Sequence, residues 1–234
     1  MEYGVFAFFS ILGMYNYHRI SKSKELVNED LRFWYNQNRN NVFVLTVFSF
    51  ISALIIVQLL IKDYQVVLSL FVPVLIASIW YVVPLFEKRL RDIPFLKSPV
   101  VAISWMIVLI AFPLLNEYNL TVNNCLQLVG FFAYFLALTI PFDIRDQKID
   151  ATNQRSLPQL FGNQFSKAIA FVFLLVFYFI FAIFYDNLRF NVVFIVCLLL
   201  TSCLILVAND KRSYLFFATV DLSMLLLSLC FFYN

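Results

Sequence analysis

The sequence predicts an all-α protein: a polytopic transmembrane helical bundle of about eight spans that forms one integral membrane domain over residues 1–234. Composition is the first reason. Apolar residues make up 62% of the chain and charged residues 13%, whereas soluble domains are about 45–50% apolar and about 25% charged. The second reason is that the apolar residues form long stretches. The third is that basic residues gather in alternate connections between these stretches.

The apolar stretches are close to the length of about 20 residues that a helix needs to cross a bilayer. They cover residues 3–17, 42–61, 65–85, 99–115, 124–142, 166–185, 190–208 and 213–232. The first is short, so its helix is expected to tilt or to thin the bilayer locally. The short gaps after the second, fourth, sixth and seventh predict tight helical hairpins, because lipid does not tolerate unpaired backbone.

Basic residues predict the orientation. Of the 17 Lys and Arg residues, 15 lie in or beside the connections 18–41, 86–98, 143–165 and 209–212, which alternation places on one face. The positive-inside rule assigns this face to the cytoplasm. We therefore expect a multi-pass protein of a bacterial inner (plasma) membrane.

Composition also limits the kind of chemistry. The net charge of +3 is small and gives no reason to expect nucleic acid as a partner. A single histidine, His18, excludes His-based zinc sites such as HExxH. The four cysteines form no CxxC pair and are interpreted as small buried apolar residues.

The main candidate site is the segment that follows Pro141, which is expected to kink or end its helix at the membrane edge. Asp143, Asp146 and Asp150 are spaced i, i+3 and i+7, so on a helix they share one face. Carboxylates placed so closely favour a hard cation such as Mg²⁺, which often bridges protein to phosphate. Three nearby cations suit phosphate oxygens: Arg145, Lys148 and Arg155. The alternative is a solvated loop of mixed charge.

Two other basic connections face the same side. In 86–98, Lys88 and Arg89 either serve only as an orientation signal or help to bind a diphosphate. In 18–41, His18 and Arg19 follow the first span, and Trp34 with Tyr35 is expected to anchor the chain at the interface.

Asp221 is an ionisable residue inside the last apolar stretch. Such a group costs about 2.5–3.5 kcal/mol at mid-membrane, so it is normally paired or faces the bundle interior. A structural hydrogen bond and a substrate or proton role are both open.

The run FDIRDQKIDATNQRSLPQLFG resembles the second aspartate-rich motif of the UbiA-type intramembrane prenyltransferases, and YVVPLFEKRLRD more loosely resembles a Tyr…Lys-Arg loop of that family. The resemblance implies a UbiA-like helical bundle that transfers a prenyl group from a polyprenyl diphosphate to a lipid-soluble, often aromatic, acceptor. It implies Mg²⁺ bound by Asp143, Asp146 and Asp150. The diphosphate contacts that it implies are Arg145, Lys148, Arg155, Lys88 and Arg89.

The sequence departs from the family at its first aspartate-rich motif. The apolar stretches before Asp143 are one fewer than the family has, so the first family helix is absent from this pattern. At the corresponding position stands Tyr15-Asn16-Tyr17-His18-Arg19, which keeps the asparagine and lacks the acids. His18 and Arg19 are candidates to replace a metal with positive charge.

Three functions remain open at this point. One is a UbiA-like prenyltransferase. Another is a family-derived protein that binds an isoprenoid diphosphate, or serves as an accessory membrane protein, without catalysis. The third is a small transporter that depends on Asp221.

Overall fold

The computed structural model describes residues 2–22, 29–84, 87–117, 121–147, 155–184, 191–211 and 214–232. Helices and their short connections account for these residues, which confirms the all-α prediction. Among the described residues, helix covers most of each apolar stretch singled out in the sequence.

Five helical segments in the described part of the chain are long and apolar enough to cross a membrane, which makes this a multi-pass membrane protein. They are Phe33–Leu60, Tyr64–Val82, Lys97–Glu117, Val122–Asp146 and Leu157–Phe184. Val192–Val207 is apolar but shorter. The number of eight spans stays a prediction.

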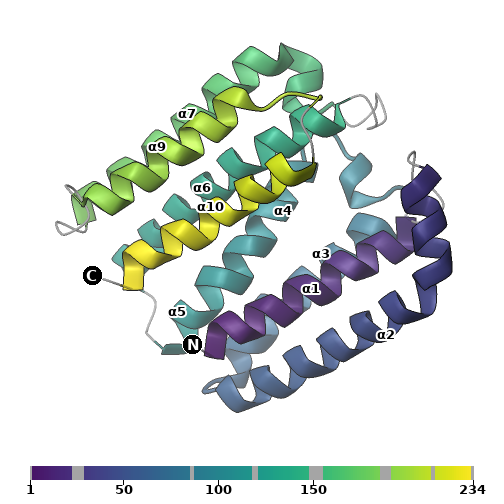
Figure 1. Ribbon diagram of the computed structural model, residues 1–234. Helices are drawn as coiled ribbons and strands as arrows, with labels where there is room; N and C mark the ends of the chain where they lie inside the picture. Colours follow the sequence, from purple (N-terminus) through teal and green to yellow (C-terminus); the bar gives the residue numbers. More distant parts are fainter. Residues whose placement is uncertain are drawn as a thin grey trace. The chain divides into compact units, whose positions relative to one another are not determined.

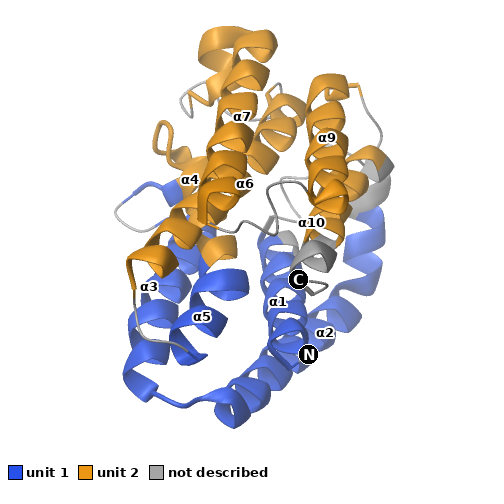
Figure 2. Ribbon diagram, turned by 90° about the vertical axis from the view of Figure 1, so that its left-hand side faces the viewer, with its two compact units in different colours: residues 1–90, 107–119 blue, residues 91–106, 120–234 orange. Residues whose placement is uncertain are grey.

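The chain divides into two compact units (Figure 2). Unit 1 comprises Met1–Leu90 and Ile107–Asn119, and unit 2 comprises Arg91–Met106 and Leu120–Asn234. A short 3-10 helix, η2 (Leu90–Asp92), lies at the first boundary. Each unit is described by itself.

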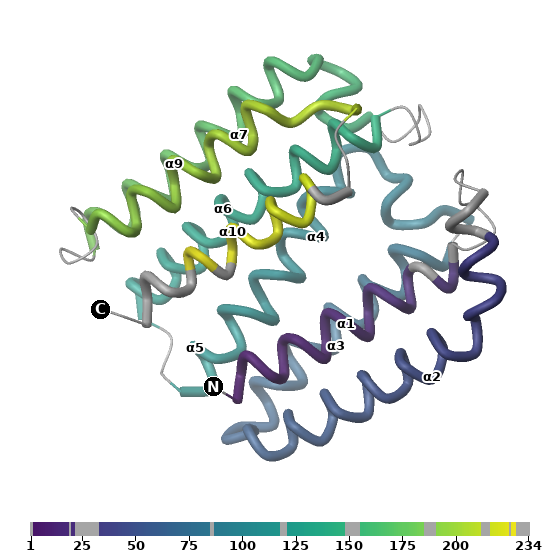
Figure 3. The backbone as a smooth tube through the Cα atoms, viewed as in Figure 1, coloured from purple at the N-terminus to yellow at the C-terminus, as the bar shows by residue number. Residues whose placement is uncertain are grey.

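In unit 1, α1 (Glu2–Lys22) and α2 (Glu29–Leu60) run antiparallel, side by side (Figures 1 and 3). Gly13 permits this approach. A Cβ atom at Gly13 would lie 3.2 Å from the Phe50 ring and 3.3 Å from the Ser49 Cβ. Small residues allow helices to pack closely in membranes, where burial from water does not drive helix association.

Unit 1 also contains α3 (Tyr64–Val82) and α5 (Phe112–Glu117). Phe6, Phe71 and Phe112, from α1, α3 and α5, form an edge-to-face aromatic triangle with centroids 5.0–5.3 Å apart. Edge-to-face contacts between rings are favourable beyond simple burial.

A π-helical segment, η3 (Ile107–Ala111), joins α4 (Lys97–Met106) to α5. Pro113 accounts for it. Proline has no N–H for the Leu109 carbonyl, and its ring collides with that carbonyl in a regular α-helix. A π turn bonds one residue further along and widens the backbone at this point.

The C-terminal end of this helix takes part in a set of polar contacts that we call the amide network: Tyr3, Leu60, Lys62, Asn116 and Glu117. The buried Asn116 amide donates to the Leu60 carbonyl (2.8 Å) and to the Tyr3 hydroxyl (2.7 Å). Its oxygen accepts from the Lys62 N–H (3.1 Å). The amide thus satisfies backbone groups that the end of α2 leaves open.

In unit 2, α6 (Val122–Asp146) and α7 (Leu157–Phe184) pack antiparallel (Figure 1). A Cβ atom at Gly130 would lie 2.9 Å from Cε2 of Phe181, so any larger residue would displace this buried ring. Buried aromatic rings surround the contact: Tyr134, Phe177, Phe181 and Phe194.

Unit 2 also contains α9 (Val192–Val207) and α10 (Tyr214–Phe232). The Asn191 side chain caps α9 by accepting from the Val193 and Phe194 N–H groups. The Tyr134 hydroxyl lies 3.4 Å from the Ser223 oxygen, which links α6 to α10.

Several predicted boundaries are wrong. α6 does not end at Pro141 but continues to Asp146, so the first two acids lie on the helix and not in a loop. α2 begins at Glu29, well before residue 42, and α7 begins at Leu157, before residue 166. Gly162, with φ 79°, interrupts α7 near its start, a conformation that glycine adopts readily.

Candidate functional site

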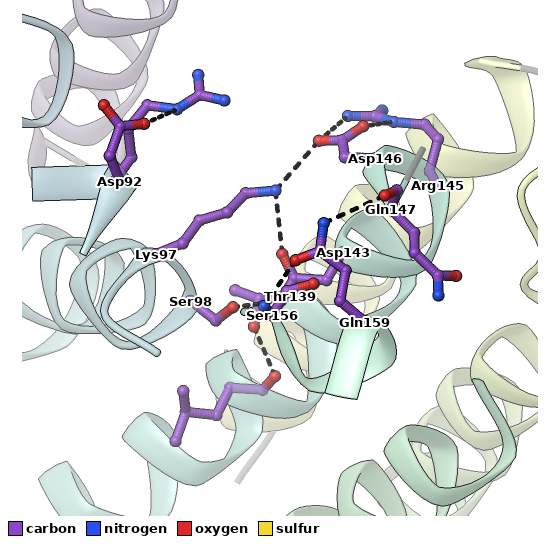
Figure 4. A network of polar contacts seen from close by, with 12 residues as sticks. Asp92, Lys97, Ser98, Thr139, Asp143, Arg145, Asp146, Gln147, Ser156 and Gln159 are labelled. Carbon is purple, nitrogen blue, oxygen red and sulfur yellow. Dashed lines mark hydrogen bonds and ion pairs between the residues drawn. The ribbon is translucent and has the colours of Figure 1, made fainter. Parts of the chain in front are cut away.

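The end of α6 carries the two acids of the predicted motif that the structure describes. Asp143 and Asp146 lie in its last turn, one helical turn apart. The prediction that they share a face is confirmed, because one ammonium group contacts both carboxylates (Figure 4). Asp150 and Lys148 lie outside the described residues.

That ammonium belongs to Lys97, the first residue of α4. Its Nζ lies 3.2 Å from Oδ1 of Asp143 and 3.5 Å from Oδ2 of Asp146. The adjacent Ser98 donates its hydroxyl to Oδ2 of Asp143. We call these side chains, together with Arg145, the carboxylate cluster: Lys97, Ser98, Asp143, Arg145 and Asp146.

Burial makes these contacts obligatory. The Asp143 side chain is only 3% exposed and that of Lys97 13%. A buried carboxylate is tolerated when a cation and hydrogen-bond donors satisfy it, and removing one partner leaves an uncompensated charge. Lys97 and Ser98 together satisfy both Asp143 oxygens.

Arg145 is the second cation of the carboxylate cluster. Its guanidinium donates to both oxygens of Asp146, at 2.7 and 3.2 Å. It also lies over the rings of Phe142 (5.2 Å) and Phe217 (4.8 Å). Cation–π attraction and a two-point hydrogen bond suit the planar guanidinium and fix its position.

Asp221 lies within electrostatic reach of this cluster, because the positive charge of Arg145 attracts its carboxylate. Phe217, whose ring lies against the Arg145 guanidinium, stands one helical turn before Asp221 on α10. An attracting cation offsets part of the cost of a carboxylate within an apolar helix.

The residues after α6 fold back onto its end. Gln147 donates to the Pro158 carbonyl (2.9 Å), and Gln159 donates to the Gln147 carbonyl (3.2 Å). The Ser156 N–H donates to the Gln159 side chain (3.0 Å). Arg155 comes directly before these hydrogen-bonded residues, and its side chain is exposed. Its φ is 45°, a left-handed value that is unusual outside glycine.

The two described acids of the motif do not present the open oxygens that the Mg²⁺ ion implied by the family resemblance would need. Mg²⁺ takes oxygen ligands in a nearly octahedral arrangement, but all four oxygens of Asp143 and Asp146 already contact Lys97, Ser98 or Arg145. Among the residues that the structure describes, no group of three His, Cys, Asp or Glu side chains is placed to hold a metal. The magnesium prediction stays untested.

The other predicted residues belong to unit 1. The Lys88 side chain is exposed, and its carbonyl accepts from the Trp80 indole (2.9 Å), while Arg89 is half-buried. Asn16 is buried and donates to the Leu12 carbonyl of its own helix.

His18 stacks on the ring of Tyr81, with centroids 5.4 Å apart and planes inclined by 17°. The Arg19 side chain lies outside what the structure describes. The carboxylate cluster belongs to unit 2, so a joint role of the two motifs stays a prediction.

Sequence reasoning counted Lys97 only as an orientation signal and missed it as a site residue. A usable signal was present. Cations are unfavourable at the N-terminal end of a helix, where the macrodipole is positive. A lysine at the first position of an apolar helix therefore points to a carboxylate partner elsewhere in the chain.

The chain matches no protein-family model, no curated protein and no solved structure.

Proposed function

We propose that the chain is a UbiA-like membrane prenyltransferase that moves a prenyl group from a polyprenyl diphosphate to a lipid-soluble, aromatic acceptor. One observation carries the proposal. Asp143 and Asp146, with Arg145 between them, lie where a helix apolar enough to cross a membrane ends. A polyprenyl diphosphate has the same division between a charged head and an apolar tail.

In this proposal the basic face of the bundle is cytoplasmic, in a bacterial inner membrane, and receives the diphosphate. Arg155, whose side chain is exposed, is a cation of this segment that a ligand can reach. Lys148 and Asp150 are assigned by the motif alone. Transfer breaks the bond between the prenyl carbon and the diphosphate oxygen, which leaves with the electron pair. A carbon–carbon bond to the acceptor forms, and the acceptor loses a proton.

The test uses the purified full chain, labelled prenyl diphosphates of several chain lengths, and a membrane lipid extract as the source of acceptor. A labelled lipid product is expected from the wild type. Asp143→Asn and Asp146→Asn should each lower its rate by about 10²-fold or more, as loss of a preorganised charge does in other active sites. The matched control is Asp63→Asn, at the N-cap of α3 in unit 1. Equal rates in all variants would refute the proposal.

The second candidate is a protein that binds an isoprenoid diphosphate, or acts as an accessory membrane protein, without turnover. The observation that favours it is the neutralisation of Asp143 and Asp146 by the chain's own cations. Calorimetric titration with geranyl diphosphate separates the two candidates. Binding without any labelled product supports the second, and a product rules it out.

A further inference from the structure

The position between Asp143 and Asp146 is held by a cation that belongs to the chain. Lys97 reaches both carboxylates from the start of α4, with its Nζ 3.2 and 3.5 Å from their oxygens. Two acids one turn apart on a helix repel each other unless a positive charge lies between them. In this protein the ammonium supplies that charge.

A divalent ion would need the same oxygens. Mg²⁺ or Mn²⁺ bound between the two carboxylates would have to displace the ammonium and the Ser98 hydroxyl from Asp143. It would also have to displace the Arg145 guanidinium or the ammonium from Asp146. An ammonium left within a few ångströms of the ion would then oppose its binding.

We infer that Lys97 takes the place of a divalent cation in the carboxylate cluster. In the wild type, Asp143 and Asp146 therefore bind no divalent ion between them. The inference has two consequences. Removing the lysine charge creates a divalent-ion site that depends on Asp143. A diphosphate that binds at this cluster contacts Lys97, and its binding needs no metal. This second consequence rests on the proposed function, and the first does not.

The first measurement is Mn²⁺ binding by electron paramagnetic resonance, on the full chain in lipid nanodiscs without diphosphate. The wild type and Lys97→Arg, which keeps the charge, should show no Mn²⁺ binding that Asp143→Asn removes. Lys97→Gln should gain a site with at least tenfold tighter Mn²⁺ binding, and Lys97→Gln with Asp143→Asn should lose it. A role limited to holding α4 against α6 would not create this site.

The matched control is Lys167→Gln. Lys167 also belongs to unit 2, but its ammonium donates to the Leu206 carbonyl, at 2.6 Å. It should bind Mn²⁺ as the wild type does. Helical content and elution volume identify the variants that fold. Folded Lys97→Gln protein that gains no Mn²⁺ site overturns the inference. If Lys97→Gln does not fold, the wild type decides: Mn²⁺ binding that Asp143→Asn abolishes overturns it, and absence of such binding supports it.

The second measurement is titration of the wild type with geranyl diphosphate in EDTA and in Mg²⁺. Equal affinity in the two buffers, and a loss of tenfold or more in Lys97→Gln, support the inference. Binding that disappears in EDTA and returns with Mg²⁺ overturns it. No binding in either buffer refutes the proposed function and leaves the Mn²⁺ experiment to decide the role of Lys97.

Discussion

The carboxylate cluster and the amide network hold the two ends of the same helical segment, Lys97–Glu117, and they handle charge in opposite ways. At the first end the charged groups are buried: the Lys97 and Asp143 side chains are 13% and 3% exposed. At the other end the ion pair of Lys62 with Glu117 is 59% and 34% exposed, and the buried polar group is the neutral Asn116 amide.

The difference shows which group stabilises each end. An exposed ion pair contributes about 0–1 kcal/mol, because water already solvates both charges. A buried pair is costly to form and more costly to break, because the remaining charge has no solvent. We therefore expect the amide to matter more than the ions in the amide network, and the ions to dominate in the carboxylate cluster.

The largest effect is expected from Lys97→Met. It leaves the buried Asp143 carboxylate without its cation and should lower the free energy of unfolding by about 3–5 kcal/mol. Denaturant titration of the protein in mixed micelles measures it. Lys97→Met with Asp143→Leu should recover part of the loss, because neither charge then remains. If Lys97→Met costs no more than Lys62→Met, the comparison fails.

The next effect is expected from Asn116→Leu, which keeps the side-chain volume and removes the amide. The Leu60 carbonyl and the Lys62 N–H then lose their partner, at a cost of about 1–3 kcal/mol. The same titration measures it. Asn38→Leu is the control, because that amide donates to the Trp34 carbonyl of its own helix. Equal losses in the two variants would show that burial of Asn116 does not matter.

Arg145→Lys tests whether geometry or charge matters on the α10 side of the carboxylate cluster. Lysine keeps the charge and loses the two-point contact with Asp146 and the flat face over Phe142 and Phe217. A loss of about 1–2 kcal/mol is expected. Denaturant titration in mixed micelles again measures the loss. Arg145→Met, which removes the charge as well, is the comparison. A lysine variant as stable as the wild type would mean that charge alone suffices.

The smallest effect is expected from Lys62→Gln. Its ammonium pairs with Glu117 at an exposed position, so the free energy of unfolding should change less than in the three variants above. The difference should shrink as salt screens the pair. Unfolding at low and high ionic strength measures both effects. A larger loss of unfolding free energy that persists in high salt would mean that the Lys62–Glu117 pair behaves like the buried Lys97–Asp143 pair.

The helical segments were predictable because lipid imposes a simple length and composition on them. Hydropathy marks only the apolar part of each helix, which explains the errors at the ends. The first residues of α2 are polar, yet they are helical from Glu29. A helix can continue into water where backbone hydrogen bonds and side-chain pairs support it. The pattern of apolar residues does not predict how far such a polar extension reaches.

The error at Pro141 has a physical reason. Proline removes one backbone hydrogen bond and disturbs its own turn. α6 nevertheless continues, because side chains from other parts of the chain stabilise the turn that follows Pro141. Asp143 and Asp146 both contact Lys97, and Gln147 and Gln159 close the end. Such contacts join residues that lie far apart in sequence, so no local rule predicts them.

The candidate site was predictable only in part for the same reason. The shared face of Asp143 and Asp146 follows from helical spacing alone. The cation between them comes from another helix, and the charge that attracts Asp221 lies at the end of α6. Spacing within one segment identifies groups that need a partner, and the fold determines which partner they have.

The length of α2 has a consequence for how deeply the chain sits in lipid. Its 32 residues extend over about 48 Å at about 1.5 Å per residue, and the hydrocarbon layer is about 30 Å thick. Trp34 is the second residue of the apolar segment Phe33–Leu60, so we expect it at the level of the lipid headgroups. Trp80 stands two residues before the end of Tyr64–Val82, whereas Trp105 lies near the middle of Lys97–Glu117. Quenching of tryptophan fluorescence by brominated lipids can therefore measure how deeply these parts of the chain lie in the bilayer.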